Sequence, residues 1–352
     1  MTIESAEFTL PKQYPTDRRS PARWVTSHAL RQWPILLAAI IGALGNAGLL
    51  SIIQVQVGKA FNVVTAPTFV PQALTSITLI ILACAAGRGI LQFARNFGFE
   101  FAAQKVERNV RRELYTSLIG KSMTFHNLQP VGDTMARATN DVREVNFLFS
   151  PGLNMVIGSL TFLIFPLIAA PRYDVQLMIV PAAFIVLYFI LLRIYMGGLA
   201  PVTEEVRESF GALNIRLAQS LDGVETVKGS AQEAGEISLF KNNVARYKAA
   251  AVAQGKKEAK FLPLLLYGVA LAAGLMHALL LFRAGRIDIG AVVGYFGLLL
   301  MLDFPTFASL WAYSRISLGL AGAKRILELM NRENNLDQNA EGYAGAMRGE
   351  VE

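Results

Sequence analysis

Residues 261–311 read FLPLLLYGVALAAGLMHALLLF, then RAGRID, then IGAVVGYFGLLLMLDFPTFASLW. Two apolar runs, each close to the roughly 20 residues that a helix needs to cross the hydrocarbon core of a membrane, are separated by only six residues. This stretch predicts two membrane-spanning helices joined by a tight turn.

Four further apolar runs of similar length precede this pair, so the chain is expected to hold six spans. The six runs are Pro34 to Ile53, Ala73 to Phe93, Leu153 to Ala170, Val175 to Met196, Phe261 to Phe282 and Ile289 to Trp311. They form three pairs with short connectors inside each pair. Between the pairs lie two inserts, about 94–152 and 197–260, which far exceed the common loop length of about 4–6 residues.

Both inserts carry the apolar period of amphipathic helices. The periodic positions are Val106, Val110, Leu114 and Leu118 in the first insert, Met135, Ala138, Val142, Val145 and Phe149 in its return limb, and Leu213, Leu217, Leu221 and Val224 in the second insert. A helix of about 25 residues extends about 38 Å. Each insert is therefore expected to form a helical hairpin that projects well beyond the membrane.

Composition and charge support a multi-pass membrane protein. The chain has 352 residues, of which 53% are hydrophobic and 17% charged, which argues against a soluble domain. Its net charge of +7 is concentrated in the N-terminal stretch and the two inserts. The positive-inside rule places these segments and both termini in the cytoplasm. The basic residues are therefore expected to meet anionic lipid headgroups, and no nucleic-acid partner is predicted.

The N-terminal stretch divides into a cytoplasmic tail, residues 1–20, and a possible interfacial helix, residues 21–33. The second part carries Trp24, Val25, Leu30 and Trp33 among basic residues, a pattern typical of a helix lying along the inner leaflet. No cleavable signal peptide is evident, since about thirty polar residues precede the first span. The single cysteine, Cys84, lies within the second span and predicts neither a disulfide nor a thiolate metal site.

The two inserts also carry motifs. The first contains Phe125-His126-Asn127, then Gly132, then Arg137 to Asp141 in the run RATND. The second contains Phe210, Leu213-Asn214 and Gln219. These motifs, in this order, resemble the two intracellular loops of ATP-binding-cassette (ABC) exporters of the six-helix, domain-swapped type. That family usually has Glu where Gln219 stands.

The resemblance implies the fold class of an all-α membrane protein that forms a domain-swapped dimer. It further implies that the loop tips, about 124–131 and about 209–219, dock on nucleotide-binding domains. The residues expected to couple to these domains are Phe125, His126, Asn127, Gly132, Arg137, Asp141, Phe210, Leu213, Asn214 and Gln219. Phe125 and Phe210 are candidate apolar plugs, with packing inside the hairpin as the alternative.

No ATPase motif is present in this sequence. It contains no Gly-x-x-x-x-Gly-Lys-Ser/Thr loop, so we expect no enzymatic activity, no catalytic residue and no cofactor or metal site in this chain. ATP and Mg²⁺ are expected in a separate nucleotide-binding domain. Residues 330–352 are expected to be a linker, because the final Gly349 to Glu352 resemble the opening strand of that domain and favour truncation of a longer chain.

Three ionisable side chains within the spans, Arg88, His277 and Asp303, are candidate cavity residues, because ionisable groups in hydrocarbon are costly unless they face water or a partner. The aromatic side chain of Phe304 is a fourth candidate, for an apolar part of the cavity wall. Arg88 and Asp303 could instead form a structural pair, and His277 is more simply a packed neutral histidine. Pro305 is expected to kink the sixth span and to act in gating. The glycines Gly42, Gly45 and Gly48 predict close helix packing.

The sequence thus favours the membrane half of an ABC exporter in the bacterial plasma membrane, moving an amphiphilic lipid, peptide, siderophore or drug. Its expected partners are a second copy or a homologous half-transporter, nucleotide-binding domains, membrane lipids and the substrate. One alternative is a proton-coupled peptide importer without ATPase domains, but Asp303 is the only acidic residue deep in a span. A non-transporting membrane scaffold is the other alternative.

Overall fold

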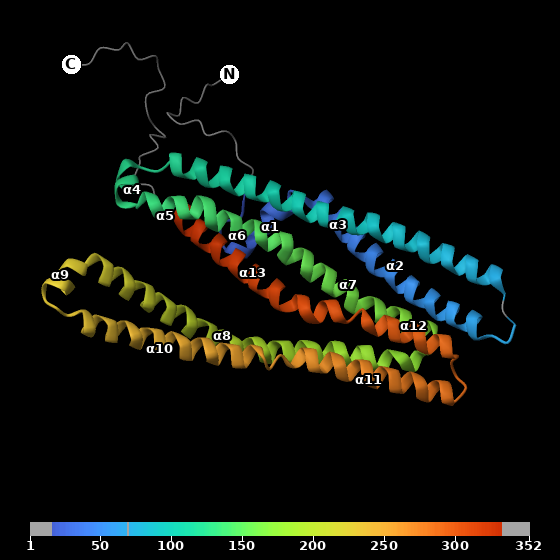
Figure 1. Ribbon diagram of the computed structural model, residues 1–352. Coiled ribbons are helices and arrows are strands. Elements are labelled where there is room, and N and C mark those ends of the chain that lie inside the picture. Colours follow the sequence, from blue (N-terminus) through green and yellow to red (C-terminus); the bar gives the residue numbers. More distant parts are fainter. Residues whose placement is uncertain (1–15, 69, 333–352) are drawn as a thin grey trace, which may run out of the picture. The chain divides into compact units, whose positions relative to one another are not determined.

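Long helices dominate the computed structural model, which describes residues 16–68 and 70–332. Six helices in this part of the chain are long and apolar enough to cross a membrane, as the six apolar runs predict. The chain divides into two compact units (Figure 1). Unit 1 comprises residues 1–165 and 307–352, and unit 2 comprises residues 166–306.

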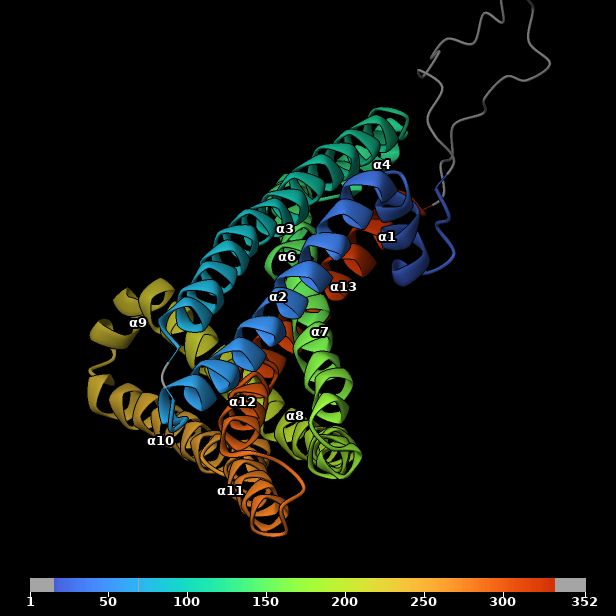
Figure 2. The ribbon, with the colours of Figure 1, turned by 90° about the vertical axis from the view of Figure 1, so that its right-hand side faces the viewer.

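Unit 1 begins with a short helix and the first pair of spans. Its first elements are α1 (Pro21–Leu30), α2 (Trp33–Thr65) and α3 (Pro71–Ile119). Helices α2 and α3 lie side by side in both views (Figure 1, Figure 2). The predicted glycine packing is confirmed here: a Cβ at Gly42 would lie 3.0 Å from the Leu91 carbonyl oxygen, and one at Gly45 would lie 2.6 Å from the Leu91 side chain. Small residues therefore set the close approach of these helices.

The third span is reached through a series of short helical segments. These are α4 (Met123–Leu128), α5 (Val131–Ala136), η1 (Arg137–Asp141), α6 (Val142–Phe147), η2 (Leu148–Leu153) and α7 (Asn154–Ala169). Non-helical dihedral angles at Ser150 mark a bend just before Pro151. Most of α13 (Asp303–Met330) also belongs to unit 1.

A hydrophobic core joins α1, α3, α6 and the end of α13. Its buried members are Trp24, Val25, Ala103, Val106, Val110, Leu114, Val142, Val145, Leu148, Phe149, Ala323, Ile326, Leu327, Leu329 and Met330. The apolar period of the first insert is therefore confirmed, with Leu118 and Ala138 packed against this core. Met135 is the exception, because it is exposed.

The segment predicted as an interfacial helix, residues 21–33, contains a helix, and its position along the inner leaflet stays a prediction. The helix spans Pro21–Leu30, and Trp24 and Val25 are buried in the core of unit 1. Leu30 and Trp33 remain exposed at the start of the first span. The predicted tail lies outside the described residues up to residue 15, and so does the predicted linker from residue 333.

Unit 2 contains the second pair of spans and the second hairpin. Its elements are the short helices η3 (Ala170–Arg172) and η4 (Val175–Met178), followed by α8 (Ile179–Asp222), α9 (Val224–Gly229), α10 (Glu233–Glu258), α11 (Leu262–Arg283) and α12 (Ile289–Leu300). Helix α8 packs along both α10 and α11. Gly285 has φ +70°, a conformation that favours glycine, at the turn between α11 and α12.

The sixth span is interrupted, as Pro305 predicts. Helix α12 ends at Leu300, and α13 starts at Asp303. Pro305 has no N–H to donate to the carbonyl of Met301, so the helical ladder fails at this point. The Tyr188 hydroxyl donates a 2.8 Å hydrogen bond to the Pro305 carbonyl. The break is therefore a packed feature of unit 2, and its use in gating stays a prediction.

Candidate functional site

The first hairpin turns through α4 and α5, which together form its tip. Ser122 caps α4 by accepting a 3.1 Å hydrogen bond from the Phe125 N–H. Pro130 then follows Gln129 and is the N-cap residue of α5. The predicted tip at about 124–131 is thus at the observed turn. His126 and Asn127 are exposed on it, and Gly132 has open space around it.

The tip exposes apolar side chains, but Phe125, which the motif predicted as a docking residue, is not among them. Phe125 is partly buried against the core of unit 1, which supports the alternative of packing inside the hairpin. Met123, Leu128 and Val131 are instead 72%, 79% and 77% exposed. Exposed apolar side chains gathered on one tip are typical of a docking surface. Sequence reasoning missed them, although apolar residues outside the helical period were a usable signal.

The tip is attached to the end of α13 through polar contacts. The buried Lys121 ammonium group donates to the Met330 carbonyl oxygen at 2.9 Å and to that of Arg332. Arg332 in turn donates to the Gln129 amide oxygen at 2.5 Å. Burial, followed by repulsion from Arg18, lowers the pKa of Lys121. These bonds occupy carbonyl groups that a helix end leaves without partners.

The Arg137–Asp141 motif also contacts α13. Asp141 accepts a two-pronged pair of hydrogen bonds from Arg325, at 2.6 and 3.0 Å, which raises the pKa of Arg325. Arg137 pairs with Asp133 at 2.9 Å and donates to the Arg325 carbonyl oxygen at 2.5 Å. Such paired arginine–carboxylate contacts are geometrically specific. These two motif residues therefore connect the return limb to α13, while their role in docking stays a prediction.

The N-terminal segment completes unit 1 around a buried carboxylate. Glu113 of α3 accepts hydrogen bonds from Thr16 at 2.6 Å, from Arg18 at 2.8 Å and from the Trp24 indole at 3.1 Å, and its other contact is with the His28 ring at 2.9 Å. This glutamate lies twenty residues beyond the second apolar run. Burial raises its pKa, but the hydrogen bonds from His28, Thr16 and Arg18 outweigh that effect and hold it at about 2.

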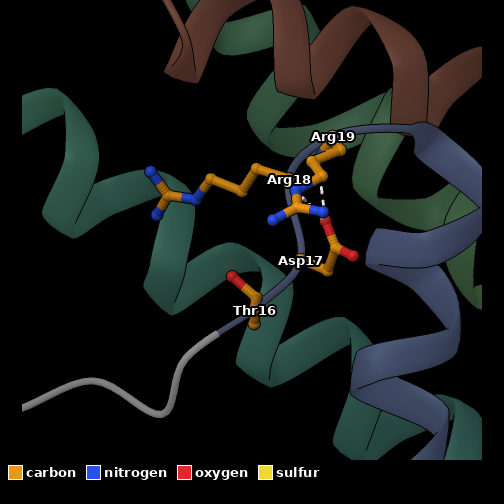
Figure 3. Close-up of a pocket in the computed structure, with 4 residues that line it drawn as sticks. All are labelled: Thr16, Asp17, Arg18 and Arg19. Carbon is orange, nitrogen blue, oxygen red and sulfur yellow. Dashed lines mark hydrogen bonds and ion pairs between the residues drawn. The ribbon is translucent and has the colours of Figure 1, made fainter.

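An open pocket of about 540 Å³ borders this contact. Figure 3 shows its lining, Thr16 to Arg19, in the segment that leads into α1. Thr16 and Arg18 already bind Glu113, and Asp17 accepts a hydrogen bond from the Arg19 N–H. The pocket is therefore part of the attachment of α1 to α3.

The second hairpin turns later than the sequence predicted. Helix α8 continues to Asp222, and the turn comprises Gly223, α9 and Ser230 to Gln232. The predicted tip at about 209–219 is thus wrong in position, because Phe210, Leu213, Asn214 and Gln219 all lie on α8 before the turn. The periodic pattern favoured one continuous helix there, and the glycine at 223 was the better signal for its end.

Contacts between α8 and α10 hold this hairpin together. The Phe210 ring packs on that of Tyr247 with centroids 5.4 Å apart, which again supports packing inside the hairpin. Arg216 pairs with Glu236 at 2.5 Å, and Arg246 pairs with Glu205 at 2.8 Å. The apolar side chains of Leu217, Leu221 and Val224 remain exposed, so the helical period of this insert is confirmed but its apolar face is not covered.

The candidate cavity residues fall in both units. Arg88 is half-buried in unit 1, where its backbone carbonyl accepts a hydrogen bond from Asn46 and its Nε is buried without a partner. His277 and Phe304 are half-buried in unit 2, and Asp303 is exposed at the start of α13. Whether these four side chains line a cavity, and whether Arg88 pairs with Asp303, stay predictions. Among the described residues, no cluster suited to a metal ion is found.

Comparisons with known proteins identify the fold. The family described as the ABC transporter transmembrane region matches residues 35–303. An uncharacterised ABC transporter ATP-binding protein, YknU of Bacillus subtilis (strain 168), is 25% identical over 74% of this chain and 45% of its own length. The probable multidrug resistance ABC transporter ATP-binding/permease protein YheI of the same organism is 24% identical over 79% of this chain and 48% of its own length.

A third relative is an ATP-dependent lipid A-core flippase of Pseudoalteromonas translucida (strain TAC 125). It is 21% identical over 58% of this chain and 35% of its own length. The chain thus spans less than half the length of each of these three relatives.

Proposed function

Since the chain belongs to the family of ABC transporter transmembrane regions, we propose that it works as the membrane-spanning half of an exporter that carries an amphiphilic substrate by alternating access. The nucleotide-binding domains that hydrolyse ATP, with Mg²⁺, lie outside these 352 residues in this proposal. The membrane is the bacterial plasma membrane, with the hairpins and termini on the cytoplasmic side, where the basic residues are concentrated.

The observation that carries this proposal is the construction of the first tip. Its exposed apolar side chains offer a surface for docking, and Lys121, Gln129 and Asp141 connect the same hairpin to α13. A displacement of the tip would therefore move the end of the sixth span with it. Such a connection is what a lever between an ATPase and a transport pathway requires.

The exposed apolar face of the second hairpin supports the pairing of two half-transporters. Leu217, Leu221 and Val224 carry the helical period of a buried stripe, yet they are exposed. A second copy, or a homologous half, would cover this stripe. The printed names of two relatives, a lipid A-core flippase and a multidrug resistance transporter, support an amphiphilic substrate. We propose an amphiphile from the lipid, peptide, siderophore or drug classes.

The test is transport in proteoliposomes, with this chain joined to nucleotide-binding domains and fluorescent lipid and peptide probes as cargo. We expect ATP-dependent transport. Leu128→Asp combined with Val131→Asp should lower transport and its coupled ATP hydrolysis at least tenfold, because two charges would be desolvated at a docked surface. Gln104→Asp, at an exposed site on the same hairpin outside the predicted docking motifs, is the control and should have little effect.

Two results would contradict the proposal. Equal transport by the tip variant and the control would exclude the tip as the coupling surface. Transport by the 352-residue chain alone under a proton gradient would support the importer alternative instead.

A further inference from the structure

Unit 1 also contains a cluster of two arginines and one phenylalanine that has no part in the proposed coupling to the nucleotide-binding domains. The Phe147 ring at the end of α6 has two guanidinium groups over it, from Arg143 at 5.2 Å and from Arg315 of α13 at 5.1 Å. The two guanidinium carbons therefore lie no further apart than the sum of these distances. Aromatic rings attract cations in this geometry, so Phe147 holds together two like charges that would otherwise repel each other.

These two cations lack an acidic partner in the described part of the chain. No hydrogen bond or ion pair engages the side chain of Arg143 or Arg315 there. The neighbouring carboxylate of Asp141 is bound by Arg325, and Glu144 also acts on Arg325 by raising its pKa. The guanidinium donors of this Arg143–Phe147–Arg315 cluster are therefore available to a ligand.

The backbone around the cluster brings α13 close to η2. A Cβ at Gly152 would lie 3.3 Å from the Cβ of Arg315 and 3.0 Å from the Phe147 carbonyl oxygen. A glycine at this position lets Arg315 approach Phe147. The cluster is thus built by contacts between two helices, in contrast to a chance gathering of long surface side chains.

The positions of Phe147 and Arg315 relative to the apolar runs place the cluster at the depth of the lipid headgroups. Phe147 precedes the third apolar run by six residues, and Arg315 follows the sixth run by four. At about 1.5 Å per residue these positions lie about 6–9 Å outside the hydrocarbon core. The headgroup layer on each side of a bilayer is about 5–8 Å thick, so the cluster faces the layer that contains the lipid phosphates.

We propose that Arg143 and Arg315, held by Phe147, bind the phosphate of an anionic phospholipid in the leaflet on the hairpin side. Guanidinium groups match the geometry of phosphate oxygens and bind them through paired hydrogen bonds. Basic sites between membrane helices commonly bind anionic headgroups on the cytoplasmic side. The assignment of the inner leaflet rests on the orientation in the proposed function, while the binding chemistry does not.

The test measures binding without ATP or transport, so its failure is distinct from failure of the proposed function. Native mass spectrometry of the 352-residue chain would give its affinity for phosphatidylglycerol and for phosphatidylcholine. We expect tighter binding of phosphatidylglycerol. The double variant Arg143→Gln with Arg315→Gln should weaken that binding about tenfold or more. Phe147→Leu should weaken it about threefold, because the cations lose their platform.

Two controls separate this site from general charge and from loss of folding. Arg112→Gln removes an exposed arginine elsewhere on the same hairpin and should leave the affinity unchanged. The double lysine variant, Arg143→Lys with Arg315→Lys, keeps both charges and should bind with intermediate affinity. If the glutamine variant does not fold, the lysine variant and Phe147→Leu decide the question.

Several results would overturn the proposal. They are unchanged binding in the folded Arg143 and Arg315 variants, an equal loss in Arg112→Gln, or equal affinity for the two lipids. Displacement of the lipid by inorganic phosphate at equal concentration would reassign the site to the free ion. A lack of displacement by excess phosphate would support the lipid.

Discussion

The two hairpins have similar sequence patterns but opposite surroundings. In the first, Leu114 is 1% exposed, because α1 and the end of α13 cover the face on which it lies. In the second, Leu221 is 64% exposed, although it occupies an equivalent place in the helical period. A pair of helices buries only the stripe between them, and a second stripe needs further elements. In the first hairpin, α1 and α13 cover the second stripe, whereas the apolar face of the second hairpin remains exposed.

Their polar contacts differ in the same way. Glu113 in the first hairpin is buried and bound by four side chains from the N-terminal segment. The corresponding contacts in the second hairpin, such as Arg246 with Glu205, are about half exposed. Exposed pairs contribute little to stability, whereas removal of one partner from a buried network is costly. In an isolated chain, the first hairpin should therefore be more stable than the second.

Removal of each hairpin's carboxylate is the strongest test of this comparison. Glu113→Ala leaves the Trp24 indole and the Arg18 guanidinium without their acceptor, so we expect a loss of about 3–5 kcal/mol. Glu205→Ala should cost no more than about 1 kcal/mol. Thermal unfolding of the two variants in detergent measures the difference. Similar midpoints would show that α1 does not stabilise the first hairpin.

A matched pair of leucines tests the apolar faces. Leu114→Ala should cost about 2–5 kcal/mol, since it opens a cavity in the core of unit 1. Leu221→Ala should change the stability of the isolated chain by no more than about 0.5 kcal/mol. The unfolding midpoint of each variant, with and without cross-linked dimer, would reveal whether a second copy covers Leu221. A large effect of Leu221→Ala in the monomer would contradict the comparison.

Acidification should weaken the first hairpin through Glu113. The folded-state pKa of Glu113, about 2, lies below its ordinary value of 4.5. Its contribution is therefore complete above pH 4.5 and is lost as the pH falls toward about 2. This contribution is about 2–3 kcal/mol.

Hydrogen exchange of α1 across this range would measure the effect. Glu113→Gln should remove the dependence of α1 protection on pH between about 4.5 and 2. If this variant keeps the same dependence, another group is responsible.

The same substitution should have opposite effects on stability at a glycine packed against the first hairpin and at a glycine within the second. A Cβ at Gly319 of α13 would lie 2.8 Å from the Glu144 carbonyl oxygen and 2.5 Å from the Leu148 Cβ, so Gly319→Ala should cost about 1–3 kcal/mol. Gly255 of α10 has open space, so Gly255→Ala should stabilise by about 0.5–1 kcal/mol through helix propensity. Differential scanning fluorimetry would record both shifts, and a gain in stability from Gly319→Ala would exclude close packing of α13.

The candidate site was only partly predictable. The first turn follows from Ser122 and Pro130, whose local chemistry ends and starts helices near the chain positions that the motif indicated. The second turn was misplaced, since an apolar period continues through Phe210 and Gln219 whether or not the face is covered. The direction of Phe125 also could not be predicted, because an aromatic side chain at a tip suits both a docking surface and the hairpin interior.

The sequence by itself determined the six spans, the two long hairpins and the family, because these depend on composition and on periodic patterns within single segments. Only the tertiary structure decided which apolar faces are covered and what the buried charges bind. Glu113 meets residues about ninety positions earlier, and Asp141 meets Arg325 across 184 positions. Such contacts depend on how distant helices pack, and no local periodicity or propensity encodes that arrangement.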